Sequence, residues 1–191
     1  MYLERKEDKM LIEWKMTDGH KPLIIKGARQ VGKTETIRNF AKNNYESLIE
    51  INFVEEPKYR TIIADGYRTV DIIKNISLLD PSKRFIPGKT LIFFDEIQQF
   101  PDIATSLKFF VQDGRFDVIC SGSLLGISYK SIESNSVGYK TDHIMRSLDF
   151  EEFMWSKGYT DTHTNMLYEK MKTMTPLNEA ELAVWHKAFL E

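Results

Sequence analysis

Short hydrophobic runs alternate with amphipathic segments along the chain, a pattern typical of a sheet built from strand–helix units. Within residues 47–53, apolar Ile49, Ile51 and Phe53 alternate with polar Glu50 and Asn52, whereas residues 91–94 are apolar throughout. A continuous apolar run is typical of a central parallel strand that helices cover on both faces. The sequence therefore predicts an α/β protein. The runs that predict strands are 22–26, 47–53, 90–94 and 116–120, with a weaker candidate at 139–148.

Helical spacing of apolar residues predicts the segments between these strands. Two short helices are expected within 58–79, with Val70, Ile73 and Ile76 on one face of the second. Asp149 and Asn178 are each followed by a glutamate three residues later, which is the capping-box signature of a helix start. The serine- and asparagine-rich stretch 126–138 predicts an exposed loop. The remaining expected helices cover 2–16, 33–43, 102–112, 149–157, 165–172 and 178–191.

Composition supports a folded core, because 42% of the 191 residues are hydrophobic and 28% are charged. The net charge of −2 gives no overall basic surface for nucleic acid. Cys120 is the single cysteine, which excludes an internal disulfide, and we expect it to be a small core residue. No secretory signal or membrane-length apolar run is present, so we expect a cytoplasmic protein without a membrane contact.

Residues 27–34 read G-A-R-Q-V-G-K-T, the phosphate-binding loop, and they lie between a predicted strand and a predicted helix. Glycines permit a tight turn whose backbone N–H groups bind phosphate at the positive end of the helix dipole. Lys33 would reach the β- and γ-phosphates, and Thr34 would ligate Mg²⁺. The residues expected to bind nucleotide here are Gly27, Ala28, Arg29, Gln30, Val31, Gly32, Lys33, Thr34 and Glu35.

Asp95 and Glu96 follow the apolar run directly, at the strand end where ligands bind in open α/β sheets. Asp95 would hold Mg²⁺ beside Thr34, and Glu96 would act as the general base for the attacking water. Glu96 and Lys33 are thus the predicted catalytic residues. Ser121 and Ser123 end the next strand, where they either sense the γ-phosphate or belong to an ordinary turn.

Four segments in this order resemble one family: residues 27–34, 91–96, 120–123 and 148–153. The chain is similar to bacterial and archaeal AAA-type ATPases that carry a C-terminal domain of unknown function. The Asp-Glu-Ile-Gln run at 95–98 and the Gly-Ser-Leu-Leu-Gly turn at 122–126 also match that family, whereas Arg146 and Ser147 stand where it often has Tyr-Pro.

The resemblance implies a P-loop NTPase with a five-stranded parallel sheet in the order 5-1-4-3-2 and helices on both faces. Family members are longer. The resemblance therefore implies an ATPase domain over residues 1–157 and a helical extension, 158–191, that begins a C-terminal region continuing beyond this chain.

The predicted function is Mg-ATP binding and hydrolysis, coupled to an attached domain, a protein partner or a second copy through the C-terminal region. A slow nucleotide-dependent switch is an alternative, and a small-molecule kinase is a weaker one because 126–138 is not an arginine-rich lid. Phosphoryl transfer usually needs an arginine. Arg29, Arg115 and Arg146 are candidates that no motif places.

Overall fold

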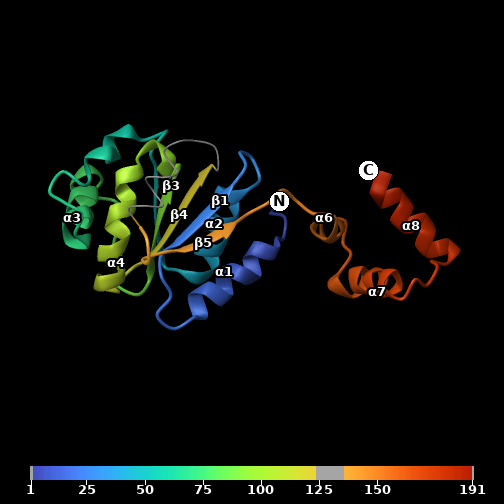
Figure 1. Cartoon of the computed structure of the whole chain (residues 1–191). Coiled ribbons are helices and arrows are strands. Elements are labelled where there is room, and N and C mark those ends of the chain that lie inside the picture. The colour runs from blue at the N-terminus through green and yellow to red at the C-terminus, as the bar shows by residue number, and fades with distance from the viewer. Residues whose placement is uncertain (1, 124–135, 191) are drawn as a thin grey trace. The chain divides into compact units, whose positions relative to one another are not determined.

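The structure is a computed structural model that describes residues 2–123 and 136–190. Contacts divide the chain into two compact units: residues 7–147, and residues up to 6 together with those from 148 onward. The first unit contains a five-stranded parallel sheet with the order β2-β3-β4-β1-β5 (Figure 1). This order is the predicted 5-1-4-3-2 counted from the opposite edge. The strands are β1 (Leu23–Gly27), β2 (Ser47–Asn52), β3 (Thr90–Asp95), β4 (Asp117–Ser123) and β5 (Thr141–Ile144).

Helices cover both faces of this sheet (Figure 1). Helices α1 (Lys6–Met16) and α2 (Lys33–Asn44) pack on one face through Leu11, Trp14 and Ile37. The opposite face is covered by α3 and α4 and by short 3-10 segments. These elements are η1 (Pro57–Thr61), α3 (Thr69–Leu79), η2 (Ile97–Gln99), η3 (Pro101–Ser106) and α4 (Leu107–Asp113).

The continuous apolar run of β3 is buried on both sides of the sheet, as predicted. Leu91 and Phe93 join the core under α1 and α2, and Ile92 and Phe94 join the core under α3 and α4. Successive side chains of a strand point to opposite faces, so every position of a doubly covered strand must be apolar. The apolar run ends at Asp95, the last residue of β3, which is itself buried.

Two expectations for the helices were wrong in detail. On α3, Ile72 and Ile76 are fully buried but Val70 is 50% exposed, because apolar residues lie on more than one side of this helix and spacing alone does not choose between them. The helix expected over 102–112 is a 3-10 helix from Pro101 to Ser106 and becomes an α-helix only at Leu107. Most of the expected loop 126–138 lies outside the described residues.

The second unit contains α6 (Phe150–Ser156), α7 (Asp161–Lys172) and α8 (Glu179–Leu190). Both predicted capping boxes are present: the Asp149 and Glu152 side chains exchange bonds with each other's backbone N–H, and Asn178 and Glu181 do the same. The domain boundary between residues 157 and 158 stays a prediction. In the described part of the chain, no helix combines the length and the hydrophobicity that a membrane span requires.

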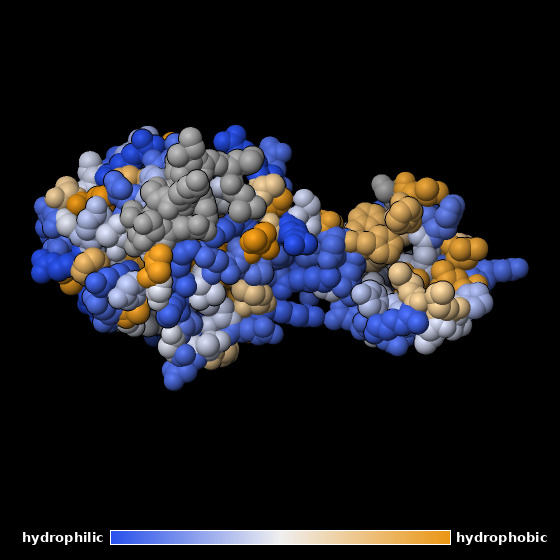
Figure 2. Space-filling model, in the orientation of Figure 1, coloured by the Kyte–Doolittle hydropathy of each residue, from blue (hydrophilic) through white to orange (hydrophobic). Residues whose placement is uncertain are grey.

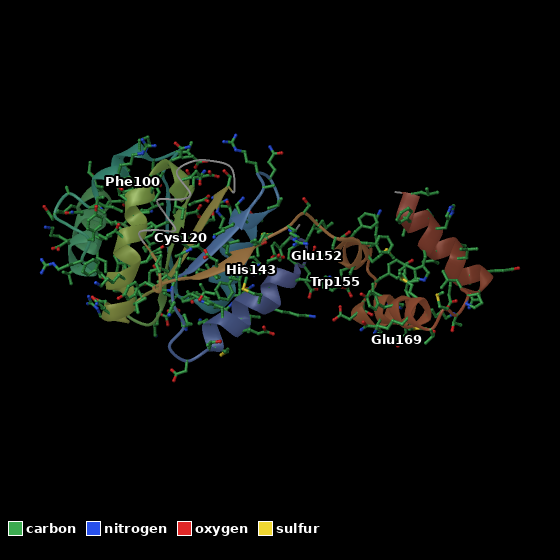
Figure 3. All side chains as sticks on the ribbon, in the orientation of Figure 1. Phe100, Cys120, His143, Glu152, Trp155 and Glu169 are labelled. Carbon is green, nitrogen blue, oxygen red and sulfur yellow. The ribbon has the colours of Figure 1, made fainter. Side chains whose placement is uncertain are left out.

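Glu152 anchors the N-terminal residues to the second unit (Figure 3). Its Oε1 accepts from Arg5 Nε at 3.1 Å and from the Lys6 backbone N–H at 2.8 Å, while its Oε2 accepts from the Asp149 N–H. The Arg5 and Glu152 side chains are only 7% and 4% exposed. A buried pair of this kind leaves an uncompensated charge when one partner is removed.

We therefore expect Glu152→Ala to lower the free energy of unfolding of the second unit by about 3 kcal/mol, through loss of the ion pair and the cap. Urea titration followed by circular dichroism and tryptophan fluorescence measures this change. Glu169→Ala is the control, because Glu169 pairs with Lys172 on an exposed surface (Figure 3) and such pairs contribute below about 1 kcal/mol. Equal losses from the two variants would contradict the anchoring role of Glu152.

Candidate active site

The loop between β1 and α2 lines an open cleft of about 580 Å³ at the C-terminal edge of the sheet. Gln30 and Gly32 have φ values of 63° and 98°, and these two left-handed positions turn the chain sharply into α2. Within the described residues, no side chain caps the first turn of α2. Its backbone N–H groups are therefore available to an anion in the cleft. The lining residues are Arg29, Gln30, Gly32, Lys33, Thr34, Glu35, Asn52, Val54, Glu55 and Glu96.

Gly27 begins the loop where a side chain has no room. A Cβ at this position would overlap the backbone carbonyl oxygen of Met145, whose N–H donates to the Lys26 carbonyl oxygen at 2.7 Å. The segment after β5 therefore holds the start of the loop from one side. The first glycine of the motif is required here for space, since its φ is not positive.

Lys33 lies on the inner side of the loop and is 7% exposed. Its Nζ donates to the carbonyl oxygens of Gly27 at 3.1 Å and Ala28 at 2.7 Å. Burial lowers the pKa of Lys33, while the negative charges of Glu96 and Asp95 act in the opposite direction. An anion bound in the cleft would further favour the charged form of this lysine.

The Asp95 carboxylate, 2% exposed, collects hydrogen bonds from several elements. Thr34 Oγ1 donates to Oδ2 at 3.0 Å, and Asn52 Nδ2 lies 3.3 Å from the same oxygen. Oδ1 accepts from Ser121 Oγ and from the Glu96 backbone N–H. The structure thus brings the predicted residues Thr34, Asp95 and Ser121 into direct contact.

Glu96 follows β3 with a φ of 55° and lines the cleft together with Lys33 and Thr34. This left-handed position turns the chain at the end of β3 and separates the environments of the two neighbouring acids. Asp95 lies behind the cleft, buried among donors, whereas the Glu96 side chain is half-buried and borders the cleft. The two carboxylates are therefore placed for different tasks.

Ser121 and Ser123 are buried, and neither is among the described residues that line the cleft. Ser121 contacts Asp95, and the Ser123 backbone N–H donates to Gln98 Oε1 at 3.3 Å. Cys120 is fully buried in the core (Figure 3), and burial raises the pKa of its thiol, which disfavours a nucleophilic thiolate.

Two residues have contacts in the site that the sequence did not predict: Asn52, and Gln98, which appeared only as the end of the family-like run at 95–98. Asn52 ends β2 beside Asp95, and its Oδ1 also accepts from the N–H groups of Val54 and Glu55 at 2.9 and 3.1 Å. Gln98 contacts the Glu96 carboxylate. A polar residue at a strand end was the available signal for Asn52, but only the pairing of β2 with β3 shows which acid it meets.

A family profile described as "AAA domain" matches residues 19–154, which is more than half of the chain. The chain belongs to the AAA domain family. This membership supports nucleotide binding and ATPase activity in general. This match does not show the C-terminal domain of unknown function that the sequence resemblance implied. No curated protein matches the chain.

Solved structures share the fold of this AAA domain at low sequence identity. Hsp104 in a closed state with ATPγS and FITC casein has a TM-score of 0.52 and 16% identity, and the match covers 83% of this chain and 29% of the Hsp104 chain. The Drosophila ORC bound to DNA has a TM-score of 0.51 and 16% identity over 86% of this chain and 48% of its own. An S. cerevisiae Hsp104–ADP complex has a TM-score of 0.52 and 15% identity, and the match covers 85% of this chain and 25% of that chain. The chain thus spans a quarter to a half of the length of these structures.

The AAA domain has a donor set that suits Mg²⁺. Thr34 Oγ1 and Asp95 Oδ2 are hard oxygen atoms that lie 3.0 Å apart beside the loop and could hold a metal. Mg²⁺ is usually held by one or two protein oxygens, with water and phosphate completing its shell. The described residues contain no cluster of three or more histidine, cysteine or acidic side chains that could enclose a metal. This sparse set fits a metal that is bound together with a nucleotide.

The three arginine candidates have different surroundings. Arg29 is exposed and lines the cleft. Arg115 precedes β4, at the sheet edge opposite the cleft, and its guanidinium binds both Asp113 oxygens at 2.7 Å. Arg146 is exposed and follows β5. Arg29 is therefore the candidate that this chain itself places at the cleft.

We expect Lys33→Ala to weaken Mg-ATP binding roughly 10- to 100-fold, because a charge-assisted bond to phosphate contributes about 1.5–3 kcal/mol. Isothermal titration calorimetry measures the affinity, and circular dichroism checks the fold. Lys42→Ala is the control, since Lys42 is exposed in the last turn of the same helix. Unchanged affinity in the folded Lys33→Ala protein would disprove the phosphate-binding assignment.

Proposed function

We propose that the protein binds Mg-ATP in the cleft and hydrolyses its γ-phosphate bond, with Glu96 as the general base. The observation that carries this proposal is the convergence of four groups. Lys33, Thr34 and Glu96 line one cleft, and Asp95 lies 3.0 Å behind the Thr34 hydroxyl. A cation, a metal-ligating pair and a carboxylate base are the parts that phosphoryl transfer to water requires.

The loop would bind the phosphates through the N–H groups at the start of α2 and through the Lys33 ammonium. Lys33 would leave its bonds to the Gly27 and Ala28 carbonyl oxygens and donate to the β- and γ-phosphates. Thr34 and Asp95 would hold Mg²⁺, which when bound neutralises charge that develops on the phosphate oxygens. Arg29 borders the cleft and would add positive charge near the γ-phosphate.

Glu96 would orient the attacking water and accept its proton, since a half-buried carboxylate at the cleft wall can reach both water and phosphate. Asp95 is unsuited to that task because donors already occupy both of its oxygens. Ser121 would act through Asp95, by fixing the metal-ligating carboxylate, rather than by touching phosphate. The rate of turnover separates an ATPase from the slow-switch alternative.

We expect Glu96→Gln to retain Mg-ATP affinity within about twofold and to lower turnover by 100-fold or more, because general-base catalysis contributes roughly 10²–10⁴-fold. Phosphate release measures turnover, and calorimetry measures binding. Glu55→Gln is the matched control, since Glu55 lines the same cleft. If the Glu96→Gln protein turns over ATP at the wild-type rate, Glu96 is not the general base. If the wild-type protein itself shows no turnover, the proposed ATPase activity is wrong.

We further propose that the nucleotide state is coupled to a protein partner or a second copy through the helices of the second unit. Hydrophobic side chains are exposed on these helices (Figure 2), including Met166 on α7 and Leu182 and Phe189 on α8, which are 56%, 56% and 78% exposed. Exposed apolar groups on neighbouring helices are characteristic of interaction surfaces.

This coupling predicts that Mg-ATP changes amide hydrogen exchange in α7 and α8 of the full chain. Mass spectrometry of peptides from residues 158–190 measures it, with Mg-ATP and Mg-ADP compared in the Glu96→Gln protein, where ATP is not consumed. Identical exchange in the two nucleotides, with protection still seen at the loop, would contradict coupling but not nucleotide binding.

A further inference from the structure

Gln98 bridges the proposed general base and the end of β4. Its Nε2 donates to Glu96 Oε2, and its Oε1 accepts from the Ser123 backbone N–H at 3.3 Å. The 3-10 turn that follows Glu96 makes this geometry possible, because the Gln99 N–H donates to the Glu96 carbonyl oxygen at 2.9 Å and folds the segment back. The half-buried side-chain amide of Gln98 therefore forms hydrogen bonds within the site through both its nitrogen and its oxygen.

Gly122 leaves the space that this amide occupies. A Cβ on Gly122 would lie 2.7 Å from Gln98 Oε1, well inside contact distance. The φ of Gly122 is not positive, so its backbone conformation does not require glycine. The absence of a side chain at this position in β4 thus serves the close approach of Gln98.

The end of β4 contacts Asp95 directly and is connected to Glu96 through Gln98. Ser121 donates to Asp95, and the Ser123 N–H binds Gln98, which in turn binds Glu96. The orientation of the base is therefore tied to the same strand end as the orientation of the metal-ligating carboxylate. A freed glutamate side chain samples several rotamers, whereas a base must lie within hydrogen-bond reach of its water.

We infer that Gln98 is a positioning residue for Glu96: it fixes the carboxylate of the base and ties its orientation to the end of β4. This inference rests on the proposed ATPase function. Gln98 is not among the described residues that line the cleft, so in this role it acts through Glu96. Its loss should act on turnover and leave nucleotide binding intact.

Gln98→Met tests the inference, because methionine keeps the length of the side chain and removes both hydrogen bonds. We expect kcat to fall between about 10-fold and 100-fold, the range for a misplaced catalytic group, while the Kd for Mg-ATP stays within about twofold. Gln99→Met is the matched control: Gln99 is the adjacent, exposed glutamine, and its replacement should leave kcat unchanged.

Gly122→Ala provides an independent variant that leaves Gln98 itself in place. Its methyl group would displace the Gln98 amide, so kcat should again fall with little change in Kd. The double variant Gln98→Met/Gly122→Ala should be no slower than the slower single variant, because both changes break the same connection between Glu96 and the end of β4. Multiplied losses would show that the two residues act separately and would overturn the inference.

The outcomes distinguish this inference from the function on which it rests. Wild-type kcat in folded Gln98→Met and Gly122→Ala proteins, with Glu96→Gln inactive, overturns the positioning role and leaves the ATPase standing. Parallel losses of kcat, Mg-ATP affinity and melting temperature show a structural role and also overturn it. A wild-type protein without turnover disproves the proposed function, and this inference falls with it.

Discussion

The buried carboxylate of Asp95 is the group on which the arrangement of this site depends. An ionised carboxylate that is 2% exposed is costly unless several donors surround it. Here the donors come from α2, β2 and β4 and from the backbone directly after β3. They meet because β3 pairs with β2 on one side and with β4 on the other. The strand order therefore brings the groups of the site together.

The same end of the sheet places a rigid loop next to this carboxylate. The start of the loop is confined by the Met145 carbonyl oxygen, and its end continues into α2, whose apolar face is buried on the sheet. Thr34, in the first turn of α2, connects the loop to Asp95. One packed core therefore supports both the groups proposed to bind phosphate and those proposed to ligate a metal, and it holds them in position without a ligand.

Local sequence signals predicted a large part of this protein. The apolar run before Asp95, the spacing of Gly27 to Thr34 and the acidic residues of the capping boxes each act within one element or one turn. Their consequences follow from short-range physics, so a buried strand, a phosphate loop and two helix starts could be identified. The helical face of α3 could not, since Val70 and Ile72 are both apolar and only packing against the sheet selects Ile72.

The sequence by itself determined the segments, and it predicted the chemistry of the loop and of the Asp95–Glu96 pair. The tertiary structure decided which distant groups complete that chemistry. Asn52 and Ser121 lie 43 and 26 positions from Asp95 in the chain, yet both bond to it because parallel strands end at the same edge of a sheet. The contacts of Gln98 with Glu96 and Ser123, and the space that Gly122 leaves for it, likewise depend on the turn after β3 lying against β4. Such contacts leave no periodic pattern in a sequence, because each depends on the relative placement of elements that are far apart in the chain.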